Sequence, residues 1–154
     1  MIRKLLFTAV AIALTTSALA GAWGAGIFDN DDALDYVDLF LEDPKRGYDF
    51  MAMSMLDIAY NDGYVGAQEA AFGLASAEVI ATVNGKPSEA LPAEIAAWAK
   101  GKDKPDALTL ERARGVLDRV LNKNNSELAQ LYADDADLDA EWRATIADLR
   151  TRLN

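Results

Sequence analysis

The chain of 154 residues carries 15 basic and 25 acidic side chains, and it contains no histidine and no cysteine. So acidic a chain repels nucleic acid and anionic lipid, because phosphates are bound by Lys and Arg. The absent side chains exclude zinc sites built on Cys and His, catalytic triads with a histidine base, and cysteine nucleophiles. Any catalysis would fall to carboxylates, Lys, Tyr, Ser or Thr.

The first twenty residues are typical of a secretory signal peptide. Arg3 and Lys4 precede an uncharged run over residues 5–14, and Ala18-Leu19-Ala20 places small residues at −3 and −1 of a cleavage site. The run is shorter than the ~20 apolar residues of a membrane-spanning helix, so we expect cleavage after Ala20 and no stable membrane insertion. The mature chain, residues 21–154, then has 13 basic and 25 acidic side chains and a formal charge of −12. These features predict a periplasmic or secreted protein.

The first half of the mature chain is predicted to form three helices, and no alternating pattern demands a strand. A helix capped at Asn30 or Asp31 ends before Pro44. A second helix over about 49–60 has little polar surface and is expected to be central. A third, over about 65–83, is rich in small residues that let neighbouring backbones approach.

The second half predicts shorter elements. A fourth helix opens at Pro92 and closes at Gly101, and a fifth contains Gly115, whose cost of ~1 kcal/mol relative to Ala suggests a close neighbour. Asn125 or Ser126 caps a sixth helix. The last helix, from about residue 137, has its apolar residues along one seam: Trp142, Ile146, Leu149 and Leu153. The sequence predicts a single all-α domain over 21–154, of about six or seven short helices.

The new N-terminus would carry two blocks, Gly21-Ala22-Trp23-Gly24 and Phe28-Asp29-Asn30-Asp31-Asp32. In this pairing the chain resembles a family of small bacterial proteins called domain of unknown function 4259. Weaker matches follow in the right order along the chain: Asp62-Gly63-Tyr64, Ala75-Ser76-Ala77-Glu78, Leu91-Pro92 with Trp98, Ser126-Glu127-Leu128 and Glu141-Trp142-Arg143. The resemblance implies a fold and a family name but brings no activity.

The resemblance also draws attention to Gly21. Similar proteins mostly begin at Met-Gly-Ala-Trp, so loss of their initiator Met would expose the Gly terminus that signal cleavage exposes here. We therefore expect the Gly21 amine to matter, for instance by facing Glu78, which lies on a small, apolar helix face; in the alternative, Glu78 reaches solvent. Trp23 and Phe28 are expected to form an apolar strap across the helices rather than an exposed recognition site.

Four carboxylates lie close together in the sequence, at Asp29, Asp31, Asp32 and Asp35. Oxygen-rich clusters suit calcium, but the spacing is not that of an EF-hand, and helix capping accounts for Asp31 and Asp32 without a metal. Candidate binding residues are assigned on the family motif: Gly21, Trp23, Asp29, Asn30, Asp31, Asp32, Asp35 and Glu78.

The favoured function is a non-enzymatic binding or interaction module, without a cofactor or metal centre, that captures a basic protein partner in the manner of an inhibitor or immunity protein. One alternative is a calcium-binding protein that uses the Asp29–Asp35 cluster. Another is a carboxylate-dependent hydrolase of envelope polymers, although no Glu or Asp lies in a distinctive catalytic motif.

Overall fold

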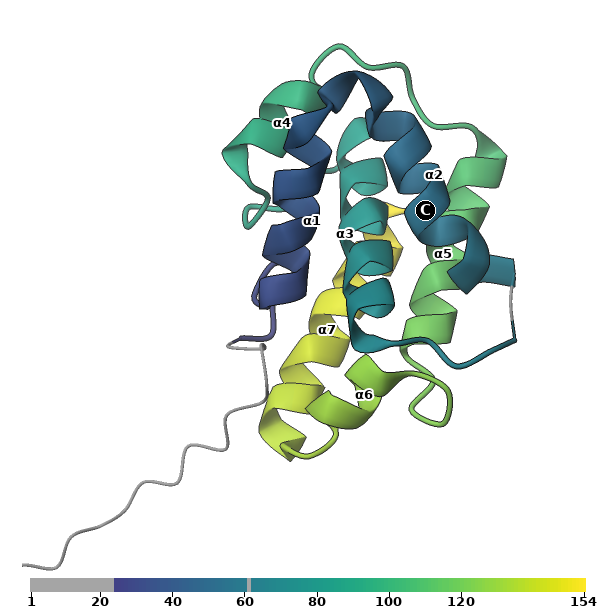
Figure 1. Ribbon diagram of the computed structural model, residues 1–154. Helices are drawn as coiled ribbons and strands as arrows, with labels where there is room; N and C mark the ends of the chain where they lie inside the picture. The colour runs from purple at the N-terminus through teal and green to yellow at the C-terminus, as the bar shows by residue number, and fades with distance from the viewer. Residues whose placement is uncertain (1–23, 61) are drawn as a thin grey trace, which may run out of the picture.

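The computed structural model describes residues 24–60 and 62–154, which are all-α (Figure 1). The signal peptide, Gly21 and Trp23 lie outside the described residues. The helices within them are α1 (Asp31–Glu42), a 3-10 turn (Pro44–Arg46), α2 (Gly47–Tyr60), α3 (Ala67–Val83), α4 (Ala93–Ala99), α5 (Ala107–Val120), α6 (Glu127–Tyr132) and α7 (Ala136–Arg152). No helix among the described residues is both long enough and apolar enough to cross a membrane.

The central element is α3, not α2 as the sequence had suggested. Helix α3 contacts six other helices, α1, α2, α4, α5, α6 and α7, and most of its residues are buried. It runs through the middle of the bundle in Figure 1. Its Ala, Gly and Ser residues allow this, because small side chains let several backbones approach from different sides. Helix α2 is rich in apolar residues, but not all of them are buried: Met53 is 71% exposed.

Capping residues read from the sequence begin several of these helices. The side-chain oxygen of Asn30 accepts a hydrogen bond from the Ala33 backbone N–H (2.8 Å), and Ser126 serves α6 in the same way through Ala129. Helix α4 begins directly after Pro92. The second helix starts at Gly47, which the sequence had placed in a turn, because the 3-10 turn leads directly into it.

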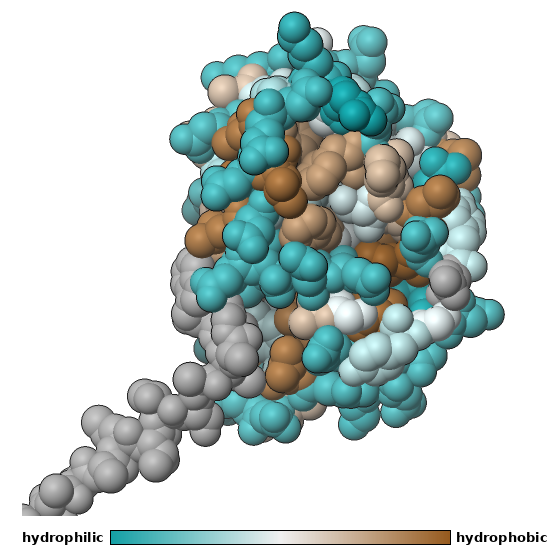
Figure 2. All heavy atoms as spheres, in the orientation of Figure 1, coloured by the Kyte–Doolittle hydropathy of each residue, from teal (hydrophilic) through white to brown (hydrophobic). Residues whose placement is uncertain are grey.

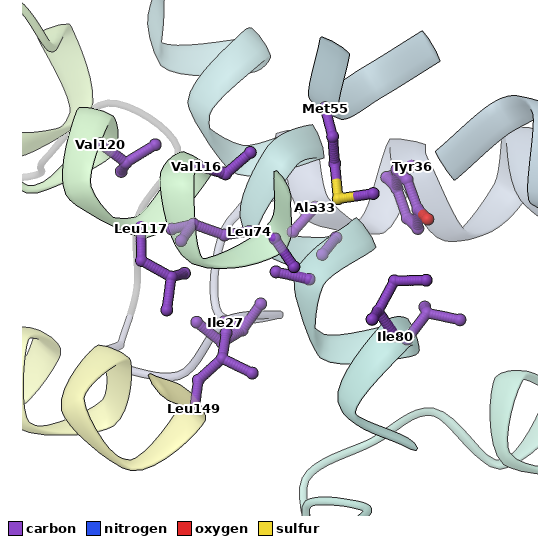
Figure 3. Close-up of a cluster of buried hydrophobic side chains, with 14 of the residues drawn as sticks. Ile27, Ala33, Tyr36, Met55, Leu74, Ile80, Val116, Leu117, Val120 and Leu149 are labelled. Atoms are coloured by element: carbon purple, nitrogen blue, oxygen red, sulfur yellow. The ribbon is translucent and has the colours of Figure 1, made fainter. Parts of the chain in front are cut away.

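The core is one continuous cluster of buried apolar side chains. Figure 3 shows how distant segments meet there: Ile27 precedes α1, while Leu74, Leu117 and Leu149 come from α3, α5 and α7. Val65 joins the lower end of the bundle, since its N–H donates to the Asn125 carbonyl (2.8 Å) and its carbonyl accepts from the Glu127 N–H (2.9 Å). The loop before α3 is thereby fixed beside the start of α6.

Candidate functional site

The described part of the N-terminal motif forms a tight turn closed by Asp29. The Asp29 carboxylate accepts a hydrogen bond from the Gly26 N–H (2.9 Å), and the Asp29 N–H donates to the Gly26 carbonyl (3.1 Å). A Cβ on Gly26 would lie 2.7 Å from the Asp29 Oδ2 atom, and one on Gly24 would lie 2.8 Å from Asp29 Cγ. A side chain at either position would displace the Asp29 carboxylate that closes the turn.

The residues that follow fix this turn to the bundle. Phe28 is buried, as expected, and the buried Asn30 caps α1. The Tyr132 hydroxyl donates to the Gly24 carbonyl (2.9 Å), and the Tyr132 ring stacks on Trp142 with centroids 4.4 Å apart. Asp29 and Asn30 thus stabilise the local structure of the motif, one by closing the turn and the other by capping α1.

Asp32 belongs to a group of acidic side chains that repel one another. Desolvation by burial and the charges of Asp35, Asp31 and Glu127 raise the pKa of Asp32 above its ordinary value. Glu127 begins α6, so the starts of α1 and α6 bring carboxylates from distant parts of the chain together. Within residues 24–60 and 62–154 no group of three or more acidic side chains is arranged to hold a metal ion, which leaves the calcium alternative without geometric support.

Glu78 is buried, with 1% of its surface exposed, so the alternative in which it reaches solvent is wrong. Its carboxylate accepts two hydrogen bonds from the Arg152 guanidinium, at 2.6 Å and 2.7 Å. This carboxylate raises the pKa of Arg152, and the bidentate pair offsets the cost of burying Glu78. The proposed partner, the Gly21 amine, lies outside the described residues, and the burial of Glu78 no longer requires it.

The strongest candidate for a binding surface is a groove between α2 and α3. It has a volume of about 300 Å³, and the loop that precedes α3 closes one end. Its apolar wall consists of Met53, Ile58, Val65 and Phe72, with the exposed ring of Tyr64 at the rim. Figure 2 shows apolar atoms gathered in the middle of this face of the molecule, bordered by hydrophilic ones.

Carboxylates line the groove and lie beside one end of it. Asp57 and Glu69 line it directly. Glu69 also accepts from the Gly66 N–H (3.1 Å), and Glu127 accepts from the neighbouring Ala67 N–H (2.9 Å), so two carboxylates lie side by side at the start of α3. The charge of Glu127 also acts on Asp32, so the carboxylates at the starts of α1, α3 and α6 lie near one another. We call this set the acidic rim: Asp31, Asp32, Asp35, Asp57, Glu69 and Glu127.

Only part of this surface was predicted from the sequence. Asp31, Asp32 and Asp35 were singled out, but Met53 and Tyr64 were missed. One signal could have pointed to Met53. Its helix has more apolar side chains than are needed to pack against the core, so one of them could be expected at the surface. Tyr64 lies in the Asp62-Gly63-Tyr64 turn that was noted for resemblance alone, and its hydroxyl donates to Gln130 Oε1 (3.0 Å).

Comparison with known proteins gives one result. The family model described as "Domain of unknown function (DUF4259)" matches residues 21–145, most of the chain. No curated protein and no solved structure matches this chain.

Proposed function

Because this chain belongs to the DUF4259 family, a family defined by sequence and not by an activity, we propose from its surface that it is a non-enzymatic binding module. The expected ligand is a basic, amphipathic helix of a partner protein. Its apolar side would lie in the groove between α2 and α3, and its Lys and Arg side chains would face the acidic rim.

The observation that carries the proposal is the meeting of apolar and acidic surface at one place. Met53 is 71% exposed and Tyr64 57% exposed, although both border a groove where burial would be favourable. Burying apolar area contributes roughly 25 cal/mol per Å². Asp57 and Glu69 flank the same groove, so a ligand that is apolar on one side and cationic on the other satisfies both.

Electrostatic repulsion within the acidic rim favours a cationic ligand. Burial raises the pKa of Asp32 above its ordinary value, and the charges of Asp35, Asp31 and Glu127 add to this, so its charged form is disfavoured in the folded protein. A ligand that brings positive charge to the acidic rim reduces the repulsion among the carboxylates, and this favourable energy adds to its affinity. The net charge of the chain, −10 with the leader and −12 without it, attracts the same class of partner over a longer range.

The proposed setting is the periplasm or the exterior of the cell. The first twenty residues have the pattern of a signal peptide, and residues 21–154 would be the released binding module. An inhibitor or immunity protein that neutralises a basic partner has this combination of size, charge and export, and we propose that role within the broader binding function.

A titration with designed peptides tests the proposal. The probe is a four-turn amphipathic helix of leucine and lysine, and its control replaces each lysine with glutamate. Binding is followed by backbone amide NMR shifts and by fluorescence anisotropy. We expect the lysine peptide to shift resonances of α2 and α3 around Met53 and Phe72, with an affinity that falls as salt rises. Equal binding of the glutamate peptide would refute the proposal.

Two pairs of variants separate groove contacts from general effects. Met53→Gln removes an exposed apolar side chain from the groove, and Leu108→Gln, which is 46% exposed in wild type, is its control on α5. Asp57→Lys and Glu89→Lys make the same change in net charge, but Glu89 lies in the loop between α3 and α4. We expect each groove variant to weaken lysine-peptide binding several-fold and each control to leave it nearly unchanged. Equal losses within a pair would point to non-specific attraction.

A further inference from the structure

A second surface of this acidic protein is rich in arginine. The described residues contain seven arginines, and all except Arg46 lie on α5 or α7. Three of them, Arg112, Arg114 and Arg150, line one hollow of about 340 Å³ between α2, α5 and α7. This hollow is separate from the groove between α2 and α3, because the two share no lining residue.

The walls of the hollow suit a small ligand that is partly apolar. Tyr60 forms one wall, and the Arg112 guanidinium lies over its ring, 5.8 Å from the centroid. Gly115 contributes no side chain, and a Cβ there would only reach ordinary contact with Ala59, at 3.6 Å. The volume lies at the lower end of the range for small-molecule sites, which begins at roughly 300 Å³.

The guanidinium groups in the hollow retain unused donors. Arg112 Nε is buried and has no hydrogen-bond partner among the described residues, and burying an N–H in this way is costly. Arg114 uses Nη1 to donate to the Leu153 carbonyl (2.9 Å). Arg150 donates through Nη2 to Asp118. A guanidinium has five donors, so all three arginines can make further hydrogen bonds.

The acidic side chains in the hollow do not neutralise it. Asp118 pairs with Arg150, and Glu111 also lines the hollow. Three positive charges therefore face two negative ones in a protein whose total charge is strongly negative. Arginine is the side chain best suited to bind carboxylates and phosphates through paired hydrogen bonds.

We infer that the hollow between α2, α5 and α7 is a binding site for a small oxyanion with at least two ionised oxygens, a phosphate or a polycarboxylate. Arg112 and Arg150 bind the oxyanion from two sides, Arg114 supplies further positive charge, and the Tyr60 ring covers the carbon or phosphorus centre. The site is independent of the peptide groove, so it stands whether or not the groove binds a basic helix.

Calorimetric titration of the purified protein tests this inference. The probes are inorganic phosphate and citrate, compared with sodium chloride at equal ionic strength. Two variants move the affinity in opposite directions: Arg112→Gln weakens binding about tenfold or more, and Glu111→Gln strengthens it several-fold by removing a like charge. Arg46→Gln, with a side chain 68% exposed and distant from the hollow, is the matched control and leaves the affinity unchanged.

The outcomes separate the possible sources of any binding. Saturable binding of phosphate alone assigns a phosphate site, and binding of citrate alone assigns a polycarboxylate site. Failure of both probes to bind refutes the inference, as does equal weakening by Arg112→Gln and Arg46→Gln, which would show only a general charge effect. Thermal melts without ligand establish that each variant is folded, and Arg150→Gln replaces Arg112→Gln if the latter is not.

Discussion

Replacing Arg152 with methionine tests whether the buried pair with Glu78 is a condition of the fold. The substitution removes the guanidinium that donates to both Glu78 oxygens, at 2.6 Å and 2.7 Å, and keeps most of the apolar stem. Glu78 is only 1% exposed, so its charge is left without its partner in a largely desolvated position. Breaking such a pair from one side costs about 3–5 kcal/mol, a large part of the ~5–15 kcal/mol that stabilises a typical domain.

The assay is urea unfolding followed by circular dichroism. Proteins of this size lose about 1–3 kcal/mol of stability per molar urea, so the loss should lower the midpoint of Arg152→Met by about 2 M. Asp148→Asn is the control, because Asp148 contacts the same guanidinium at 2.7 Å but its side chain is 66% exposed. A surface pair of this kind contributes about 0–1 kcal/mol, and its midpoint should move little.

A double variant distinguishes loss of charge balance from loss of packing. Glu78→Leu combined with Arg152→Met removes both charges and replaces them with apolar side chains of similar size. Well-packed apolar residues often replace a buried ion pair at no cost. The double variant should therefore be more stable than Arg152→Met alone. If it is less stable, or if Arg152→Met costs no more than Asp148→Asn, the reasoning about a buried charge is wrong.

Three further predictions concern single positions. Gly47→Ala should lose about 1–3 kcal/mol in urea unfolding, because its Cβ would lie 2.6 Å from a Trp98 ring atom, whereas Gly115→Ala, with 3.6 Å of space, should gain about 1 kcal/mol. Burial raises the pKa of Tyr132 to about 12 from 10, so the stability that its protonated hydroxyl contributes is complete below pH 10 and is lost as the pH rises through 12. In thermal melts between pH 9 and 12, the melting temperature of Tyr132→Phe should therefore fall less steeply with pH than that of wild type. Asp32→Asn should raise the melting temperature at pH 7, where the disfavoured carboxylate is charged, and the gain should vanish below the ordinary pKa of 3.8.

The sequence was a good guide wherever a local interaction decides the structure. Asn30 and Ser126 were each one of two candidate caps, and the structure selects them over Asp31 and Asn125. The candidates could be found because a side chain that accepts from a backbone N–H three residues later needs no tertiary information. Pro92 marked the start of α4, since proline is tolerated only at the beginning of a helix, and this too is a local effect.

Tertiary partners could not be read in this way. The small, apolar face of α3 suggested that Glu78 is buried, but its partner Arg152 lies 74 residues away and nothing in the local sequence links them. The central position went to α3 rather than α2 because small side chains, not large apolar ones, let many helices meet. The groove was missed for a related reason, since its lining residues come from α2, α3 and the Tyr64 loop and are brought together only by the fold.

The structure distinguishes residues whose contacts stabilise the fold from residues that have no stabilising contact to account for them. Asp29 and Asn30 have backbone partners within their own turn, so the motif is explained by structure without any ligand. Met53 and the charge on Asp32 are different, because the folded chain leaves one exposed to water and the other among like charges. These are the two features that the proposed peptide ligand would satisfy, one by burial and the other by charge. Asp32→Asn and Asp57→Lys should therefore weaken peptide binding while preserving or raising stability, whereas Asp29→Ala should lower stability first.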